Sequence, residues 1–268
     1  MKIFRTRKEF ENWRSEAEGP CVGFVPTMGA LHEGHASLLK KAKVKCNQIV
    51  LSILVNPTQF GNTQDLETYP NTLEADLALA KSVGVDVVIA PTAEDMYGGK
   101  PEAKPIDWGA ITSEFEGAHR PGHFDGVVAI VDILLSVVKP DLAFFGEKDL
   151  QQVAVVRRLA AEKHPGVEIV SCELIREVSG LALSSRNTRL SERGVEVALE
   201  LSRALNKAKQ SGIATGRAML ENHPEIELEY FEGVNEISFE SNDVPENYTH
   251  IVVAAEVEGV RLIDNIRL

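Results

Sequence analysis

Short apolar runs alternate with longer amphipathic stretches over the first two thirds of the chain. Apolar runs without polar alternation are typical of strands buried on both faces of a parallel sheet. Such runs lie at 21–25, 48–55, 86–90, 141–145 and 167–171. Apolar positions recur at helical spacing over 36–46, 72–83, 127–138 and 149–163. The alternation predicts an α/β fold with a Rossmann-like, doubly wound parallel sheet.

The pattern changes after about residue 174. A polar loop over 176–190 leads into a long helical stretch at 191–210. Shorter, strand-like runs follow at 226–231, 249–256 and 260–264. We therefore expect two domains, a Rossmann-like domain over 1–174 and a second, smaller α+β domain over 175–268.

The composition of the 268-residue chain is that of an ordinary globular protein, with 44% apolar and 25% charged residues. No window approaches the ~20 apolar residues of a membrane span, and the first residues lack the apolar core of a signal peptide. Cys21, Cys46 and Cys172 contain no Cys-x-x-Cys pair and indicate reduced, buried thiols. We therefore expect a cytoplasmic protein without a membrane partner.

The net charge of −12 repels polyanions and counts against nucleic acid as a partner. A small phosphorylated ligand is still compatible with this charge, because salt screens distant charges over about 8 Å. We expect small molecules as the partners.

The segment Pro26–His35 joins the first apolar run to the first helical pattern and contains Gly29 and Gly34. A strand, a glycine-bearing turn and a helix N-terminus form a phosphate cradle, because the first N–H groups of a helix lack helical partners. His32 and His35, about one turn apart, add hydrogen-bond donors. The spacing mimics a P-loop, but His35 stands where that loop requires lysine. The motif is H-x-G-H, the signature of nucleotidyl-transferring enzymes that attack an α-phosphate.

Two further polar loops follow apolar runs, and the carboxyl ends of parallel strands meet at one edge of a sheet. The first begins at Asn56 and extends over 56–71, a length that is more often functional than idle. The amides of Asn56 and Gln59, with Tyr69, suit hydroxyl and carboxylate oxygens of a substrate. A plain surface turn is the alternative for Gln59.

The second of these loops, Gly146–Asp149, places Lys148 at a strand end and a helix start. An ammonium there suits the charge on a transferring phosphoryl group. Asp149 is either a helix cap or a magnesium ligand, and Gln152, one turn on, points the same way. A structural role for the loop is the alternative.

The loop before the long C-terminal helix contains Ser184, Ser185 and Arg186 in succession. Two hydroxyls and a guanidinium can bind a polyphosphate, and a helix N-cap is the alternative. Arg120 and His123, in a rigid polar segment, face either a substrate or a partner subunit.

In this order and spacing the motifs resemble the pantothenate synthetases, the pantoate–β-alanine ligase family. The resemblance covers nearly the whole chain and its combination of motifs is highly specific. It includes Asn56-Pro57-x-Gln59-Phe60, Tyr69-Pro70, Arg120-Pro121-Gly122-His123-Phe124 and Arg261-Leu262-Ile263-Asp264-Asn265-Ile266.

The resemblance implies a Rossmann-like ATP-binding domain with a C-terminal lid, a homodimer and a requirement for Mg²⁺. It implies His35 as the usual proton donor, and Asp149 is the candidate metal ligand that the residue pattern offers. The implied catalytic residues are His35, His32, Lys148 and Arg186. The implied ATP-binding residues are Met28, Gly29, Ala30, Leu31, His32, Glu33, Gly34, His35, Gly146, Glu147, Lys148, Asp149, Ile175, Leu183, Ser184, Ser185 and Arg186. The implied residues for pantoate are Gln59 and Gln152. With Asn56 and Tyr69, which the residue pattern adds, they make up the expected set for pantoate and β-alanine.

Four positions depart from the family pattern. Leu183 replaces a common methionine and Leu150 an aromatic residue, whereas Asn71 replaces a common arginine and Ser179 an aspartate. The last two affect loop contacts, and no principal site residue is lost.

A ligase of this family would activate pantoate as pantoyl-adenylate and then transfer the pantoyl group to β-alanine, releasing pyrophosphate and AMP. Three other functions compete. A nucleotidylyltransferase would keep the nucleotide on its product, and a nucleotide sensor would bind ATP without turnover. An aminoacyl-tRNA synthetase fragment should carry a basic RNA-binding domain, which this acidic chain lacks.

Overall fold

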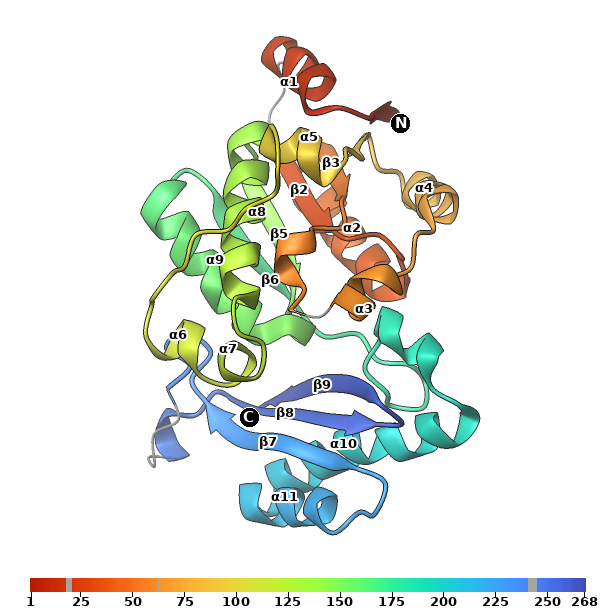
Figure 1. The fold of residues 1–268 in the computed structure, drawn as a ribbon, viewed down its shortest axis with the longest axis vertical. Coiled ribbons are helices and arrows are strands. Elements are labelled where there is room, and N and C mark those ends of the chain that lie inside the picture. The colour runs from red at the N-terminus through yellow and green to blue at the C-terminus, as the bar shows by residue number, and fades with distance from the viewer. Residues whose placement is uncertain (18–20, 62, 241–244) are drawn as a thin grey trace.

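The computed structural model of the chain describes residues 1–17, 21–61, 63–240 and 245–268. Within these residues it contains a six-stranded and a three-stranded sheet, which lie one above the other in Figure 1. Asn62, inside the loop predicted at 56–71, lies outside the described residues.

The larger sheet is parallel throughout, with the strand order β1-β4-β3-β2-β5-β6. The predicted doubly wound parallel sheet is thereby confirmed. β1 was not predicted, because three residues are too few to give a pattern. The strands are β1 (Lys2–Phe4), β2 (Val22–Thr27), β3 (Gln48–Ile53), β4 (Val87–Ile89), β5 (Leu142–Gly146) and β6 (Glu168–Cys172).

Helices cover both faces of this sheet. Phe24 belongs to the core shared with α1, α8 and α9, and the next residue, Val25, belongs to the core shared with α2 and α4. Burial on both faces explains the continuous apolar runs. α1 was not predicted, because Phe10 is the one buried residue among its ten. The helices are α1 (Arg7–Glu16), α2 (Glu33–Lys45), α4 (Leu73–Ser82), α8 (His123–Val138) and α9 (Leu150–Lys163).

The chain changes direction across the sheet at β2. From β2 it runs outward through β3 and β4, and it then crosses to β5 and β6 on the other side. Ligands of open parallel sheets bind at the carboxyl ends of the strands beside such a switch point. Thr27 ends β2 and Gly146 ends β5. The H-x-G-H motif and the Lys148 loop therefore leave the same edge of the sheet, as predicted.

The C-terminal part forms the smaller α+β unit. Its sheet is antiparallel in the order β7-β8-β9, and two helices pack on it. The elements are β7 (Glu227–Val234), β8 (His250–Val257), β9 (Val260–Arg267), α10 (Glu192–Ser211) and α11 (Ile213–Glu221). α11 was not predicted, because Gly216 interrupts its pattern. A Cβ at Gly216 would lie 2.4 Å from the Ala204 carbonyl oxygen, so glycine lets α11 approach α10.

Short elements occupy the connections. They are η1 (Pro57–Gln59), α3 (Thr63–Glu67), α5 (Ala93–Tyr97), α6 (Ala110–Ser113), α7 (Glu116–His119), η2 (Glu147–Asp149), η3 (Ser185–Arg189) and η4 (Pro245–Asn247). Among the described residues no helix combines the length and apolar character that crossing a membrane requires.

All three cysteines are free thiols; Cys46 and Cys172 are buried as predicted, whereas Cys21 is half-buried.

Candidate active site

The turn after β2 and the first turn of α2 hold the two histidines of the motif. Gly29 and Ala30 adopt left-handed conformations, with φ of 84° and 50°, and turn the chain toward α2. His32 is the N-cap of α2, and its Nδ1 accepts the backbone N–H of Gly34 at 3.1 Å. The Nδ1 of His35 accepts the backbone N–H of His32 at 3.3 Å. Two imidazoles thus form the reciprocal hydrogen bonds of a capping box.

Both imidazoles are neutral and keep one N–H outside these capping bonds. An Nδ1 that accepts an N–H carries no proton, so the proton of the neutral ring sits on Nε2. Burial, followed by the Lys148 ammonium, lowers the pKa of His32. Burial, followed by the adjacent His32, lowers the pKa of His35 to about 3. The ring centroids are 4.2 Å apart, so a charge on either ring would repel a charge on the other.

Gly34 makes room for an imidazole. A Cβ at this position would lie 2.8 Å from Cε1 and 2.9 Å from Nδ1 of His32, closer than non-bonded carbon and nitrogen atoms approach. The glycine of H-x-G-H is therefore required by the ring that caps the helix as well as by access to the backbone.

Asp76 of α4 holds the turn through its backbone N–H groups, a role that was not predicted from the sequence. Its carboxylate accepts the backbone N–H of Ala30 at 3.1 Å and of Leu31 at 2.7 Å, and the Thr72 hydroxyl at 3.1 Å. The residue is 2% exposed. In the sequence, a lone aspartate in an amphipathic helix has the pattern of a solvated residue. No signal in the chain links it to a turn 46 residues away in sequence.

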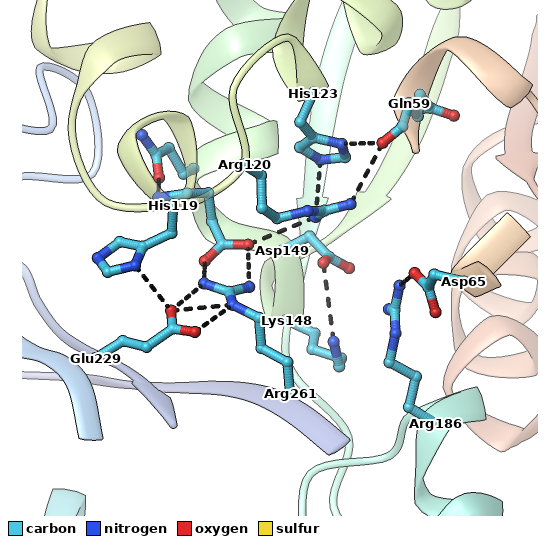
Figure 2. Close-up of polar contacts among 12 residues, drawn as sticks. Gln59, Asp65, His119, Arg120, His123, Lys148, Asp149, Arg186, Glu229 and Arg261 are labelled. Carbon is cyan, nitrogen blue, oxygen red and sulfur yellow. Dashed lines mark hydrogen bonds and ion pairs between the residues drawn. The ribbon is translucent and has the colours of Figure 1, made fainter. Parts of the chain in front are cut away.

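Lys148 and Asp149 reach the site from η2. The Lys148 Nζ lies 3.8 Å from Oδ1 of Asp149. A dashed line joins this pair in Figure 2. The Lys148 side chain is 20% exposed and that of Asp149 is 49% exposed. No group of three or more His, Cys, Asp and Glu side chains among the described residues could hold a metal ion. Asp149 therefore offers a metal one carboxylate beside open solvent.

Asn56 lies beneath the site. Its Nδ2 donates to the Gly126 carbonyl at 3.0 Å, and its Oδ1 accepts the hydroxyls of Thr58 at 3.0 Å and Tyr97 at 3.1 Å. The side chain is 1% exposed. These bonds fix η1 against α8, and the amide predicted to meet a substrate is occupied within the protein. Gln59, at the end of η1, lines the cavity instead.

Arg120 and His123 face the same cavity, although the sequence left a partner subunit as an alternative. Figure 2 shows both residues on the backbone of Gln59. Nδ1 of His123 donates to the Gln59 carbonyl at 2.9 Å, and its Nε2 accepts from Arg120 at 3.1 Å. Burial, and then the Arg120 guanidinium, lowers the pKa of His123 to about 4. The ring is therefore neutral at pH 7.

A buried ion cluster joins this region to the C-terminal sheet. Glu116 accepts two hydrogen bonds from Arg261, at 2.8 and 2.6 Å, and one from the Tyr230 hydroxyl at 2.7 Å. Burial alone would raise the pKa of Glu116, but Arg261 outweighs it and holds the pKa at about 2. Arg120 lies 3.5 Å from the same carboxylate. α7 and β9 are thereby connected directly behind the cavity.

The C-terminal loop closes the cavity from the other side. Leu183 donates its N–H to the Ile175 carbonyl at 3.1 Å, so these two predicted residues are neighbours. Ser184 caps η3 by accepting the N–H of Arg186 at 3.2 Å. The Arg186 guanidinium contacts Asp65 of α3 at 2.9 Å.

Most of the predicted site residues meet around one cavity at the carboxyl edge of the sheet. These are Met28, His32, Gly34, His35, Gln59, Tyr69, Gly146, Lys148, Asp149, Gln152, Ile175, Leu183, Ser184, Ser185 and Arg186. The others lie outside its lining: Gly29, Ala30, Leu31, Glu33, Asn56 and Glu147.

The residues outside the lining have other contacts. The side chain of Glu33 is 70% exposed and lies 3.6 Å from Lys40. The Glu147 carboxylate accepts the Ser171 hydroxyl at 2.6 Å. Neither of these two carboxylates lines the cavity, whose charged lining residues include Lys148 and Arg186 as cations and Asp149 as a carboxylate.

A switch-point crevice, an H-x-G-H helix cap with neutral imidazoles and a converging lysine and arginine define a nucleotide-binding α/β enzyme of the nucleotidyl-transferring class. The family model described as pantoate–β-alanine ligase matches residues 2–267. The chain belongs to the pantoate–β-alanine ligase family.

Individual proteins similar to this chain support the same family assignment. A pantothenate synthetase from Cytophaga hutchinsonii is 46% identical over 91% of this chain and 90% of its own length. One from Porphyromonas gingivalis is 41% identical over 100% of this chain and 99% of its own length. The prediction of a ligase is confirmed, in preference to a nucleotidylyltransferase, a sensor or a synthetase fragment.

Solved structures share the whole fold. Pantothenate synthetase from Thermus thermophilus matches with a TM-score of 0.91 and 38% identity, covering 100% of this chain and 99% of that one. The pantoate–β-alanine ligase from Francisella tularensis, complexed with β-γ ATP and β-alanine, matches with a TM-score of 0.86 and 35% identity, covering 100% and 97%.

Proposed function

We propose that the chain condenses (R)-pantoate with β-alanine at the expense of ATP, through a pantoyl-adenylate, and releases AMP and pyrophosphate. The observation that carries this proposal is the convergence of His32, His35, Lys148 and Arg186 on one cavity at the switch point. These residues come from distant parts of the chain, and together they suit a bound triphosphate.

The neutral imidazoles act as donors to the phosphate oxygens. Each holds its Nε2–H ready, because its Nδ1 is occupied by a backbone N–H. Such donors stabilise charge that develops on the pyrophosphate without first having to be protonated. With a pKa of about 3, His35 acts at pH 7 through its N–H and not as an imidazolium.

The first step needs positioning more than base catalysis. A carboxylate with a pKa near 4 is ionised at pH 7, so the pantoate oxygen attacks the α-phosphate directly. Its phosphorus–oxygen bond forms as the bond to pyrophosphate breaks, and Lys148 and Arg186 take up the charge that moves onto the leaving group. The side chains of Gln59, Gln152 and Tyr69 hold pantoate, and Asn56 supports Gln59 from beneath.

The second step requires the neutral amine of β-alanine. The amine attacks the acyl carbon of the adenylate, AMP leaves with the bonding electrons, and an amide remains. Neither imidazole of the motif offers a free lone pair, since both Nδ1 atoms accept backbone N–H groups. The amine must therefore arrive deprotonated or lose its proton to another group.

Magnesium fits this site as a companion of the triphosphate. Mg²⁺ is commonly held by one or two carboxylates together with phosphate oxygens and water. Asp149 is the candidate carboxylate, and the bound ion would neutralise charge on the phosphates.

We further propose that the domain over 175–268 acts as a lid on the domain over 1–174, excluding water from the mixed anhydride. The family resemblance also supports a homodimer. A cytoplasmic location is supported by the three free cysteines.

Pantoate-dependent exchange of labelled pyrophosphate into ATP tests the proposal. We expect exchange with pantoate alone, and release of AMP only once β-alanine is added. Retention of the nucleotide on the product would indicate a nucleotidylyltransferase, and the absence of exchange in the wild-type protein would refute the ligase mechanism.

A further inference from the structure

Asn265 connects the last strand of the C-terminal sheet to the turn that carries Lys148. Its side-chain Nδ2 donates to the Glu147 carbonyl at 2.7 Å and lies 3.4 Å from the Lys148 carbonyl. The residue is 6% exposed. An amide that donates to two successive carbonyls of a turn fixes the path of that turn, and so fixes where the side chain on it begins.

The turn is held on its other side as well. The Ser171 hydroxyl, in β6, donates to the Glu147 carboxylate at 2.6 Å. η2 therefore lies between a strand of the large sheet and a strand of the small one. Lys148 projects from a turn whose position depends on both domains.

Asn265 is itself held rigidly. Its backbone N–H donates to Oδ1 of Asp264 at 2.7 Å, and its carbonyl accepts from Nη2 of Arg176 at 2.9 Å. Arg176 and Asp264 form a bidentate ion pair at 2.7 and 2.8 Å. Arg176 also donates to the Gly180 carbonyl at 3.1 Å, within the loop that leads to Ser184–Arg186. One partly buried ion pair thus joins this amide to the loop on the other side of the cavity.

We propose that Asn265 is a positioning residue for Lys148, through which docking of the C-terminal sheet sets the ammonium against the phosphates. This inference rests on the proposed function of Lys148. Asn265 itself touches no substrate, because it acts on the main chain of η2. The site is complete only when β9 lies against η2, which couples closure of the C-terminal domain to catalysis.

The test uses Asn265→Asp in the full-length protein. This isosteric change replaces the donor with a carboxylate facing the Glu147 carbonyl. We expect ATP to bind about tenfold more weakly, as for the loss of one to two hydrogen bonds. We expect kcat for pyrophosphate exchange to fall about 10- to 100-fold, as for a catalytic group displaced by about 1 Å. Asn206→Asp is the matched control, since Asn206 donates to the Ser202 carbonyl at 2.8 Å within α10. It should change neither quantity.

A double-mutant cycle separates positioning from general support. ATP affinity, measured by calorimetry, is compared among the wild type, Asn265→Asp, Lys148→Ala and the double variant. If Asn265 acts through Lys148, its change costs nothing further once the lysine is gone. Losses that multiply, or an Asn265→Asp enzyme equal to the wild type, would overturn the proposal.

Two controls distinguish a positioning role of Asn265 from a folding defect and from failure of the proposed function. Asn265→Ala, which removes the donor without adding charge, is measured in parallel, and thermal unfolding of each variant identifies any folding defect. ATP binding is read without turnover, so failure of the exchange assay in the wild type would refute the proposed function and still leave the cycle informative on Asn265.

Discussion

Asp65 holds Arg186 by an ion pair of 2.9 Å at the mouth of the cavity. Arg189 contacts the same carboxylate at 3.1 Å, and Figure 2 shows the Asp65–Arg186 pair opposite Lys148. Burial alone would raise the pKa of Asp65, but the two guanidiniums outweigh it and lower the pKa. α3 lies between β3 and β4 and η3 lies in the loop before α10, so this contact draws the two segments together and also occupies the guanidinium proposed to meet the triphosphate.

Asp65→Asn should therefore strengthen ATP binding. The nucleotide must displace Asp65 from Arg186, and this competition disappears when the carboxylate becomes an amide. Both side chains are nearly 30% exposed. We expect a two- to fivefold lower Kd for ATP, the equivalent of about 0.5–1 kcal/mol. Titration calorimetry with ATP measures it.

Asp132→Asn is the control for the loss of one negative charge. Asp132 also contacts two basic side chains, Lys163 and His164, but at a place outside the cavity lining. It should leave the Kd for ATP unchanged. Weaker binding of ATP by Asp65→Asn would mean that Asp65 supports Arg186 instead of competing for it.

Gly34→Ala should impair adenylate formation while the protein stays folded. The new methyl group would lie 2.8 Å from His32 Cε1, so the ring must tilt and its Nε2–H moves. We expect exchange to slow about 10- to 100-fold. Gly166→Ala is the control, because a Cβ at Gly166 meets no atom within 4 Å. Equal rates in both variants would show that the ring position does not matter.

Acid should destabilise the protein through its buried histidines. The pKa of His35 is lowered from 6.5 to about 3 by burial, and then by His32. Below pH 6.5 the unfolded chain therefore binds a proton that the folded chain excludes, so the free energy of unfolding falls as the pH falls. One histidine contributes up to about 1.4 kcal/mol per pH unit.

Urea unfolding of the wild type and His35→Gln between pH 7.5 and pH 4.5 measures this effect. The curve of the variant should fall less steeply below pH 6.5, by about 1.4 kcal/mol per pH unit. Acid also lowers the free energy of unfolding through Glu116, but only below about pH 4.5. The pKa of this carboxyl is lowered from 4.5 to about 2 in the folded chain, so the unfolded chain takes up the proton first. His223→Gln, at the end of α11, is the control. Parallel curves for the wild type and His35→Gln would contradict a buried, neutral His35.

The sequence predicted the parallel sheet and the convergence of its polar loops, because both follow from local pattern. Apolar runs reveal strands buried on both faces, and strand ends place His32 and Lys148 at one edge. The predicted ends of the helices and strands were less exact than the fold itself. α8 begins at His123 instead of 127, since the polar His123 and Asp125 hide its first turn.

The supporting residues could not be predicted in this way. Asp76, Asp65 and Asn265 act on groups 45 or more residues away in sequence. Each is a common polar residue in an ordinary pattern, and only the folded chain determines its partner. Asn56 shows the opposite difficulty. Its residue type suited a substrate, but the fold uses its amide internally.

Asn56→Ala and Gln59→Ala should distinguish a residue that stabilises the fold beneath the cavity from one that contacts pantoate. Loss of the Asn56 amide leaves the Gly126 carbonyl and the Tyr97 hydroxyl without this buried partner, and should lower the free energy of unfolding by about 2–3 kcal/mol. Gln59 lines the cavity, so its truncation should raise KM for pantoate and lower the unfolding free energy less than the Asn56 change does. Urea unfolding and steady-state kinetics on both variants measure the two effects. If Asn56→Ala raised KM for pantoate without loss of stability, the amide would face the substrate after all.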